Sequence, residues 1–185
     1  MWYRRNLPHW QPAGATIFLT WRLYGTLPTA HRPDARTVGE HGRAFVEADR
    51  LLDCARTGPL WLRIPDIAKH LVELVERGAS GRQFFELHSF VVMPNHVHLL
   101  ITPLKPLPVI TRWLKGASAH QANQILQRKG NPFWQDESFD HWVRSGREFD
   151  KIKQYIEENP VKAGLVKKPG DWPYSSARKS TEDTG

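Results

Sequence analysis

Two histidines separated by a single valine form the first candidate for a functional site in this sequence. His96, Val97 and His98 follow Pro94 and Asn95 in the stretch VVMPNHVHLLITP, which otherwise has the composition of a buried strand. Because residues i and i+2 of a strand face the same side, the two imidazoles project together, with Cα atoms roughly 6.5–7 Å apart. Such a pair can share one metal ion through one nitrogen of each ring, or it can be two sheet histidines satisfied by hydrogen bonds or water.

A tyrosine and an asparagine one helical turn apart form the second candidate element. In the stretch FDKIKQYIEENP, Ile152 and Ile156 have helical spacing, and Tyr155 lies beside them. Asn159 follows Tyr155 by four residues, which places both on one helix face, and Pro160 predicts that the helix ends there. Tyr155 is therefore either a nucleophile or a partly buried core residue, and Asn159 is either a site residue or simply the end of a helix.

Strands and helices alternate along the chain in an order that predicts how these side chains are held. The expected strands are Ala15–Leu23, Gln83–Met93, His96–Pro103 and Phe133–Val143, and the expected helices cover about residues 36–55, Pro65–Gly78, Pro108–Ile125 and Arg147–Asn159. This order predicts an α+β fold, a ferredoxin-like βαββαβ sandwich. Its antiparallel sheet would carry helices on one face, and an extra C-terminal helix would hold Tyr155. We expect one domain over residues 1–185, with a helical insertion at about 29–59 and a basic tail of little regular structure from about 161.

The composition restricts the class of protein. The chain has 185 residues and a formal net charge of +7, which favours a polyanionic partner such as nucleic acid or an anionic membrane surface. Its single cysteine, Cys54, allows neither an internal disulfide nor a cysteine-based zinc site. The first residues lack the apolar run of a signal peptide, and no apolar run approaches the roughly 20 residues that span a bilayer. We therefore expect a soluble, cytoplasmic protein without a membrane partner.

Four separated motifs resemble one family. MPNHVHLLITP, FWQDESFDHWVR, YIEENPVKAGLV and WPYSSA occur in the order found in the REP-associated tyrosine transposases, which are single-tyrosine HUH nucleases related to insertion-sequence transposases. HUH denotes two histidines around a hydrophobic residue, here His96, Val97 and His98. The resemblance covers roughly the first strand to Ala177, and residues from about 29 to 59 match nothing in it.

The resemblance implies a chemistry for each candidate residue. His96 and His98 would bind a divalent metal ion, Mg²⁺ or Mn²⁺, and Asn159 would complete the metal site. Tyr155 would attack a phosphodiester of single-stranded DNA, form a 5′-phosphotyrosine and free a 3′-hydroxyl. The metal identity comes from the resemblance, because imidazole by itself suits zinc and Mg²⁺ prefers oxygen ligands. We find no general base, and we interpret His120 and His141 as ordinary hydrogen-bonded or solvated histidines.

The expected partner is single-stranded DNA, beside hairpin-forming repeats. Basic residues on the helix preceding the tyrosine helix, on or before that helix and in the tail are candidate phosphate contacts: Arg112, Lys115, Arg144, Arg147, Lys151, Lys153, Lys162, Lys167, Lys168 and Arg178. Trp172 and Tyr174 can either stack a base or pack the tail down, and packing is favoured. The sequence is compatible with a monomer and with a homodimer.

Two other functions remain open from the sequence. A non-catalytic DNA-binding protein could keep the fold, although such a protein has no need of His96, His98 and Tyr155 together. An RNA-binding or RNA-processing protein could also use a βαββαβ fold, but the chain has no RNP1-like aromatic strand motif.

Overall fold

The computed structural model describes residues 14–26, 58–136 and 138–178. Its sheet has four strands in the order β2-β3-β1-β4, and each neighbouring pair is antiparallel. The strands are β1 (Ile17–Arg22), β2 (Phe85–Val92), β3 (His96–Pro103) and β4 (Phe139–Trp142). The sequence of elements and the order of strands confirm the predicted α+β, ferredoxin-like βαββαβ sandwich.

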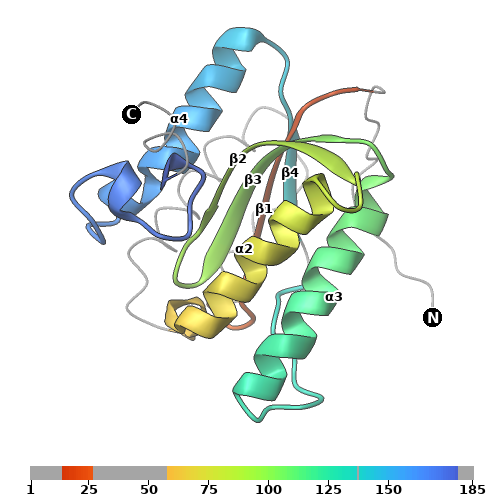
Figure 1. The fold of residues 1–185 in the computed structure, drawn as a ribbon, viewed down its shortest axis with the longest axis vertical. Coiled ribbons are helices and arrows are strands. Elements are labelled where there is room, and N and C mark those ends of the chain that lie inside the picture. Colours follow the sequence, from red (N-terminus) through yellow and green to blue (C-terminus); the bar gives the residue numbers. More distant parts are fainter. Residues whose placement is uncertain (1–13, 27–57, 137, 179–185) are drawn as a thin grey trace.

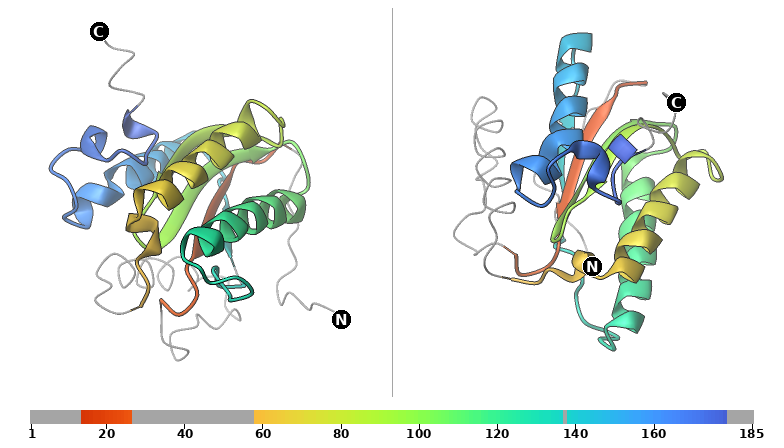
Figure 2. Two further views of the ribbon diagram at one scale, coloured as in Figure 1. Left: turned by 60° about the horizontal axis from the view of Figure 1, so that its bottom comes forward. Right: turned by 60° about the vertical axis from the view of Figure 1, so that its left-hand side comes forward.

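Helices cover both faces of this sheet. The helical elements are η2 (Trp61–Arg63), α2 (Pro65–Ala79), α3 (Leu107–Ile125), α4 (Gly146–Lys162) and η3 (Pro169–Asp171). α2 and α3 lie on one side of the sheet, and α4 with the C-terminal segment lies on the other (Figures 1 and 2). The predicted extra helix that carries the tyrosine is α4, and it packs on the face opposite α2 and α3.

The alternation of β3 divides its side chains between two separate cores. Val97, Leu99 and Ile101 belong to the apolar cluster that α2 and α3 cover. Leu100 belongs to the cluster on the opposite face, where it meets Ile156 of α4. The even-numbered residues of β3, including both histidines, therefore face α4, because successive strand residues point to opposite sides.

The predicted end of α4 at Pro160 is wrong, because the helix continues to Lys162. A proline in the last turn removes only one backbone donor, and its ring does not prevent the few residues after it from remaining helical. The helix ends instead in a Schellman motif, in which Leu165 N–H donates to the carbonyl of Pro160 and Gly164 N–H donates to that of Val161, both at 2.9 Å. Gly164 adopts a φ of 70° there, a conformation that glycine accepts without strain.

The last strand is shorter than predicted. Among the described residues of the expected strand Phe133–Val143, the four residues of β4 are a strand and Trp134 forms an isolated bridge with Leu23. The backbone of Phe133 to Gln135 still pairs with residues 22–24, through hydrogen bonds of 2.9 Å. The side chains of Phe133 and Trp134 enter the core that α2 and α3 cover, where the Trp134 indole N–H donates to Ser118 Oγ at 2.9 Å.

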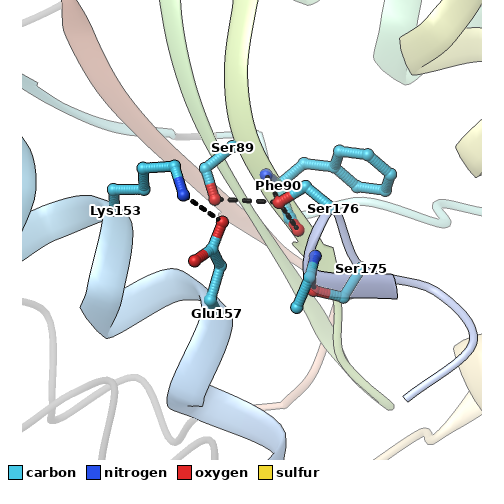
Figure 3. Close-up of polar contacts among 7 residues, drawn as sticks. Ser89, Phe90, Lys153, Glu157, Ser175 and Ser176 are labelled. Carbon is cyan, nitrogen blue, oxygen red and sulfur yellow. Dashed lines mark hydrogen bonds and ion pairs between the residues drawn. The ribbon is translucent and has the colours of Figure 1, made fainter. Parts of the chain in front are cut away.

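The C-terminal segment is more regular than predicted, because it pairs with the outer edge of β2. Val92 N–H donates to the carbonyl of Tyr174 at 2.9 Å, and Ser176 N–H donates to the carbonyl of Phe90 at 3.0 Å. Figure 3 shows the Ser176 side chain against Phe90 of this edge. The Trp172 indole N–H donates to the carbonyl of Val92 at 3.0 Å, so Trp172 packs the segment down, which was the favoured prediction.

Some predictions fall on residues that the structure does not describe. The expected helix at about 36–55, nearly all of the expected insertion at 29–59, and Cys54 lie outside the described residues. Within the described ranges, none of the helices combines the length and the apolar character that crossing a bilayer requires.

Candidate functional site

The two histidines lie side by side on the α4 face of β3. Both are completely buried, and their ring centroids are 4.7 Å apart with an interplanar angle of 70°. The pairing of β1 with β3 places Arg22 opposite His96 and Thr20 opposite His98. The predicted common orientation of the two imidazoles is thus present, on the central strand pair of the sheet.

A neighbouring side chain holds each imidazole at Nδ1. His96 Nδ1 lies 2.7 Å from Asn95 Oδ1, and His98 Nδ1 lies 2.7 Å from Thr20 Oγ1. Asn95 and Thr20 are themselves 1% and 5% exposed, so both hydrogen bonds are shielded from water. Rings held in this way cannot rotate freely, and each directs its other nitrogen, Nε2, away from its partner.

α4 brings the predicted tyrosine and asparagine to the histidines. The Tyr155 ring lies 5.7 Å from the His98 ring, and Phe18 of β1 contacts both, at 6.2 Å and 5.5 Å between centroids. Asn159 is completely buried one turn later, with its Nδ2 at 3.5 Å from His98 Nε2. His96, His98, Tyr155 and Asn159, chosen from the sequence alone, therefore meet at one place between the sheet and α4.

The donor atoms at this place are compatible with a small divalent cation. The buried Oδ1 of Asn159 has no hydrogen-bond partner among the residues that the structure describes. The 3.5 Å between His98 Nε2 and Asn159 Nδ2 is near the roughly 3 Å that separates adjacent ligands on a cation with bonds of about 2.1 Å. A rotation of the Asn159 side-chain amide by half a turn would place Oδ1, in place of Nδ2, next to His98 Nε2. In the described part of the chain, no three His, Cys, Asp or Glu side chains form a metal cluster, so a cation here would need the asparagine.

Local hydrogen bonds fix the start of the tyrosine helix. Ser145 caps α4 by accepting from the backbone N–H of Glu148 at 3.2 Å, and Glu148 Oε2 accepts from the backbone N–H of Arg144 at 2.7 Å. The other oxygen of Glu148 lies 2.8 Å from His141 Nε2 on β4. Glu148 therefore ties the first turn of α4 to the edge strand, which helps to set where Tyr155 lies.

This anchor predicts a pH dependence of stability. Burial raises the pKa of the Glu148 carboxyl, but hydrogen bonds from Arg144 N–H and His141, with the positive charges of both residues, outweigh it and hold that pKa below its usual range. A carboxyl with a lowered pKa in the folded state stabilises above its unfolded pKa, and the contribution is lost as pH falls through the folded pKa. Glu148→Gln should therefore cost about 1 kcal/mol near pH 7 and almost nothing near pH 2.5.

Urea unfolding of both proteins at the two pH values measures this difference. An equal cost of Glu148→Gln at both pH values would mean that the ionised carboxylate is not what stabilises the start of α4.

Most of the predicted phosphate contacts lie on α4 or in the segments before and after it. The exposed ones on α4 or in the segments around it are Arg144, Arg147, Lys151, Lys162, Lys167, Lys168 and Arg178. Lys153 is half-buried and pairs with Glu157 at 2.7 Å, as Figure 3 shows. Lys162 pairs with Glu158 at 3.1 Å, and its Nζ also lies 5.3 Å from the Tyr155 ring centroid. These side chains place positive charge along the tyrosine helix.

Two of the predicted contacts lie elsewhere. Arg112 and Lys115 are on α3, which covers the face of the sheet opposite the histidines. The Lys115 ammonium donates to the carbonyls of Gln135 and Asp136, at 2.6 and 2.9 Å, and so supports the segment before β4. The structure therefore does not place these two side chains beside Tyr155. Their position in a predicted helix could not show which face of the sheet that helix would cover.

Sequence reasoning missed the two residues that hold the histidines. Asn95 directly precedes His96, but its place after a proline also fits an ordinary turn residue. Thr20 is a polar residue in the apolar strand ATIFLTWRL, and that contrast was a usable signal. Its partner could not be identified, because the register of β1 against β3 is not visible in the sequence.

Comparison with known proteins shows that this chain is similar to transposases. A family model described as "Transposase IS200 like" matches residues 63–159. The REP-associated tyrosine transposase of Escherichia coli (strain K12) is 32% identical over 95 residues, covering 50% of this chain and 54% of that protein. A relative from Haemophilus influenzae is 30% identical over 112 residues, covering 53% of this chain and 62% of that protein. The chain thus spans between about half and three fifths of the length of the curated relatives that it matches.

A solved structure has the same fold. It is described as a REP-associated tyrosine transposase bound to a REP hairpin, and it superimposes with a TM-score of 0.57 at 22% sequence identity. The similarity covers 98% of this chain and 86% of the other. At 22% sequence identity, this similarity is evidence for a shared fold and for nothing beyond it.

Proposed function

Because the chain belongs to the family of IS200-like transposases, we propose that it cuts and transfers strands of single-stranded DNA through a covalent bond to Tyr155. One observation carries this proposal. Tyr155, His96, His98 and Asn159 come from two elements far apart in the sequence, and they converge on one face of the sheet. A protein that only binds DNA has no need for this combination of a phenol, two buried imidazoles and a buried amide.

His96, His98 and Asn159 would hold a divalent cation, Mg²⁺ or Mn²⁺. The two Nε2 atoms and the amide Oδ1 would supply three ligands to such an ion. When bound, such an ion supplies positive charge that polarises the scissile phosphate and offsets the charge that develops on it. The preference for Mg²⁺ or Mn²⁺ over zinc rests on the family resemblance, since two imidazoles by themselves favour a softer ion.

Tyr155 would act as the nucleophile. Its oxygen forms a bond to the phosphorus while the bond from phosphorus to the 3′ oxygen breaks, which leaves a 5′-phosphotyrosine and a 3′-hydroxyl. The phenol proton passes to solvent, and the departing 3′ oxygen takes up a proton, so the step is balanced. Because one phosphodiester replaces another, its energy is retained and a 3′-hydroxyl can later reverse the attack and join strands.

The surroundings of the tyrosine suit this step. Tyrosine is a weak nucleophile at neutral pH, because its hydroxyl ordinarily has a pKa near 10. Phe18 and His98 pack against the ring and fix its direction, which reduces the freedom that must be lost before attack. The ammonium of Lys162 near the ring adds positive charge beside the group that attacks.

The substrate we propose is unpaired DNA next to a hairpin. The basic side chains along α4 attract any DNA backbone, so they explain affinity and not the choice of sequence. An unpaired strand can bend toward Tyr155, whereas a duplex keeps its backbone stiff over a persistence length of about 150 bp. The hairpin follows from the family resemblance and from the DNA in the solved structure of similar fold.

This substrate preference is directly testable. A labelled single-stranded oligonucleotide with a hairpin and unpaired flanks should be nicked in the presence of Mn²⁺, and the same strand annealed to its full complement should be cut at least roughly tenfold more slowly. Denaturing gels measure both rates, and the same samples show a covalent protein–DNA adduct. Binding should also weaken steeply with salt.

The Tyr155→Phe protein in the same assay controls for contaminating nucleases. Equal cleavage of both substrates would contradict the single-strand preference, tight binding without any adduct would favour a non-catalytic DNA-binding protein, and cleavage of an RNA version alone would make the protein an RNA-processing enzyme.

A further inference from the structure

We propose that Thr20 and Asn95 are positioning residues that select the ring nitrogen which His98 and His96 present to a metal ion. The proposal rests on the cation site of the proposed function. It adds that this site depends on two side chains outside the set of metal ligands, one on β1 and one in the turn before β3. Each holds the hydrogen of one imidazole on Nδ1 and so keeps the lone pair of the neutral ring on Nε2.

The argument for His96 depends on what an amide oxygen can do. Asn95 Oδ1 lies 2.7 Å from His96 Nδ1, and a carboxamide oxygen only accepts hydrogen bonds. The hydrogen between the two atoms must therefore belong to Nδ1. A neutral imidazole carries one N–H, so Nε2 of His96 keeps its lone pair and can act as a metal ligand.

Two neighbours of His98 give the same assignment for its ring. In the orientation that the structure shows, before any half-turn toward a cation, the Asn159 amide presents Nδ2 at 3.5 Å from His98 Nε2. An amide nitrogen only donates, so Nε2 is the acceptor in this arrangement. The hydrogen of the ring is then on Nδ1, which donates to Thr20 Oγ1 at 2.7 Å. A threonine hydroxyl can donate or accept, and the amide on the other side of the ring determines that here it accepts.

The location of these two hydrogen bonds in the sheet and their burial both make them strong. Thr20 and His98 are direct partners in the antiparallel pairing of β1 with β3, so the backbone ladder itself fixes the distance between them. Both hydrogen bonds are buried, where a hydrogen bond is stronger than in water. Loss of such an outer partner of a metal-binding histidine typically weakens metal binding roughly 10–100-fold.

The test uses the full chain and two readouts that need no DNA. Mn²⁺ binding is measured by electron paramagnetic resonance, and the histidine tautomers of the metal-free protein are measured by ¹⁵N NMR. Wild type should show the Nδ1–H tautomer at His96 and His98. Thr20→Val should bind Mn²⁺ roughly 10–100-fold more weakly and lose the pure Nδ1–H tautomer at His98 alone, and Thr20→Ser should restore both.

The matched control is Thr16→Val. Thr16 lies just before β1, and its hydroxyl bonds across to Thr102 of β3 at 3.0 Å. Thr102 Oγ1 in turn lies 2.8 Å from Nε2 of His88, a histidine outside the proposed metal site. This variant should bind Mn²⁺ like wild type. Asn95→Ala gives a second, independent measurement at His96, so the proposal can still be decided if one variant fails to fold.

Each outcome supports or overturns the proposal. An Nε2–H tautomer in the wild-type protein would overturn it, as would unchanged Mn²⁺ affinity in both Thr20→Val and Asn95→Ala. Equal weakening by Thr16→Val would also overturn it, because the effect would then be a general loss of sheet stability. If wild type bound no Mn²⁺ at all, the metal part of the proposed function would fail, and the tautomer measurement alone would still decide the roles of Thr20 and Asn95.

Discussion

Replacing Tyr155 with phenylalanine is expected to abolish DNA cleavage and the covalent protein–DNA adduct together. The change removes one oxygen atom and keeps the ring that packs against His98 and Phe18, so the fold and the affinity for DNA should be preserved. Without the hydroxyl no phosphotyrosine can form, and the cleavage rate should fall by about 10⁴ or more, as when the nucleophile of other covalent enzymes is removed.

Tyr174→Phe is the matched control for that variant. Tyr174 is a second partly buried tyrosine, in the segment that pairs with β2. Removing its hydroxyl group should leave the cleavage rate unchanged. Mass spectrometry of the trapped adduct should place the DNA on Tyr155. An adduct of ordinary yield in the Tyr155→Phe protein would show that another residue attacks.

Replacing His98 with alanine should lower the cleavage rate by more than about 100-fold. Removal of an outer partner of a metal ligand already costs roughly 10–100-fold in metal affinity, and removal of the ligand itself should cost more. Chelation of divalent ions with EDTA should inactivate the wild-type protein to a similar extent, and added Mn²⁺ should restore the wild type but not the variant.

His98 also packs against Phe18 and Tyr155, so its replacement opens a cavity. The cost should be roughly 1–3 kcal/mol, and unfolding must be measured alongside activity at a temperature where the variant remains folded. His120→Ala is the control, because His120 is exposed on α3, on the other side of the sheet. Full cleavage by the His98→Ala protein in the presence of EDTA would reject a metal site at this position.

The sequence predicted the parts of the site that depend on local periodicity. An alternation of two places His96 and His98 on one side of a strand whatever the rest of the chain does. A separation of four residues likewise places Tyr155 and Asn159 on one helix face. The apolar character of Val97 and Leu99 then determines which side of β3 meets the larger core, so the histidines had to occupy the other side.

Features that depend on tertiary contacts were missed or misjudged. Pro160 is an unfavourable helical residue, but a favourable Schellman end at Gly164 extends α4 beyond it. Trp134 forms an isolated bridge with Leu23 and is not part of β4, and its indole N–H donates to Ser118 of α3, a tertiary partner that no local pattern reveals. The role of Thr20 depends on the register between two strands, and no local pattern encodes that register.

The pairing of the C-terminal segment with β2 has a consequence for how the molecule behaves in solution. β2 is an edge strand of the sheet, and an uncovered edge with apolar residues such as Phe90 and Val92 is a template on which a strand of another molecule can add. Tyr174 and Ser176 occupy the backbone groups at that place, so the protein's own chain blocks the addition. The WPYSSA motif therefore protects the protein against edge-to-edge aggregation, independently of any chemistry at Tyr155.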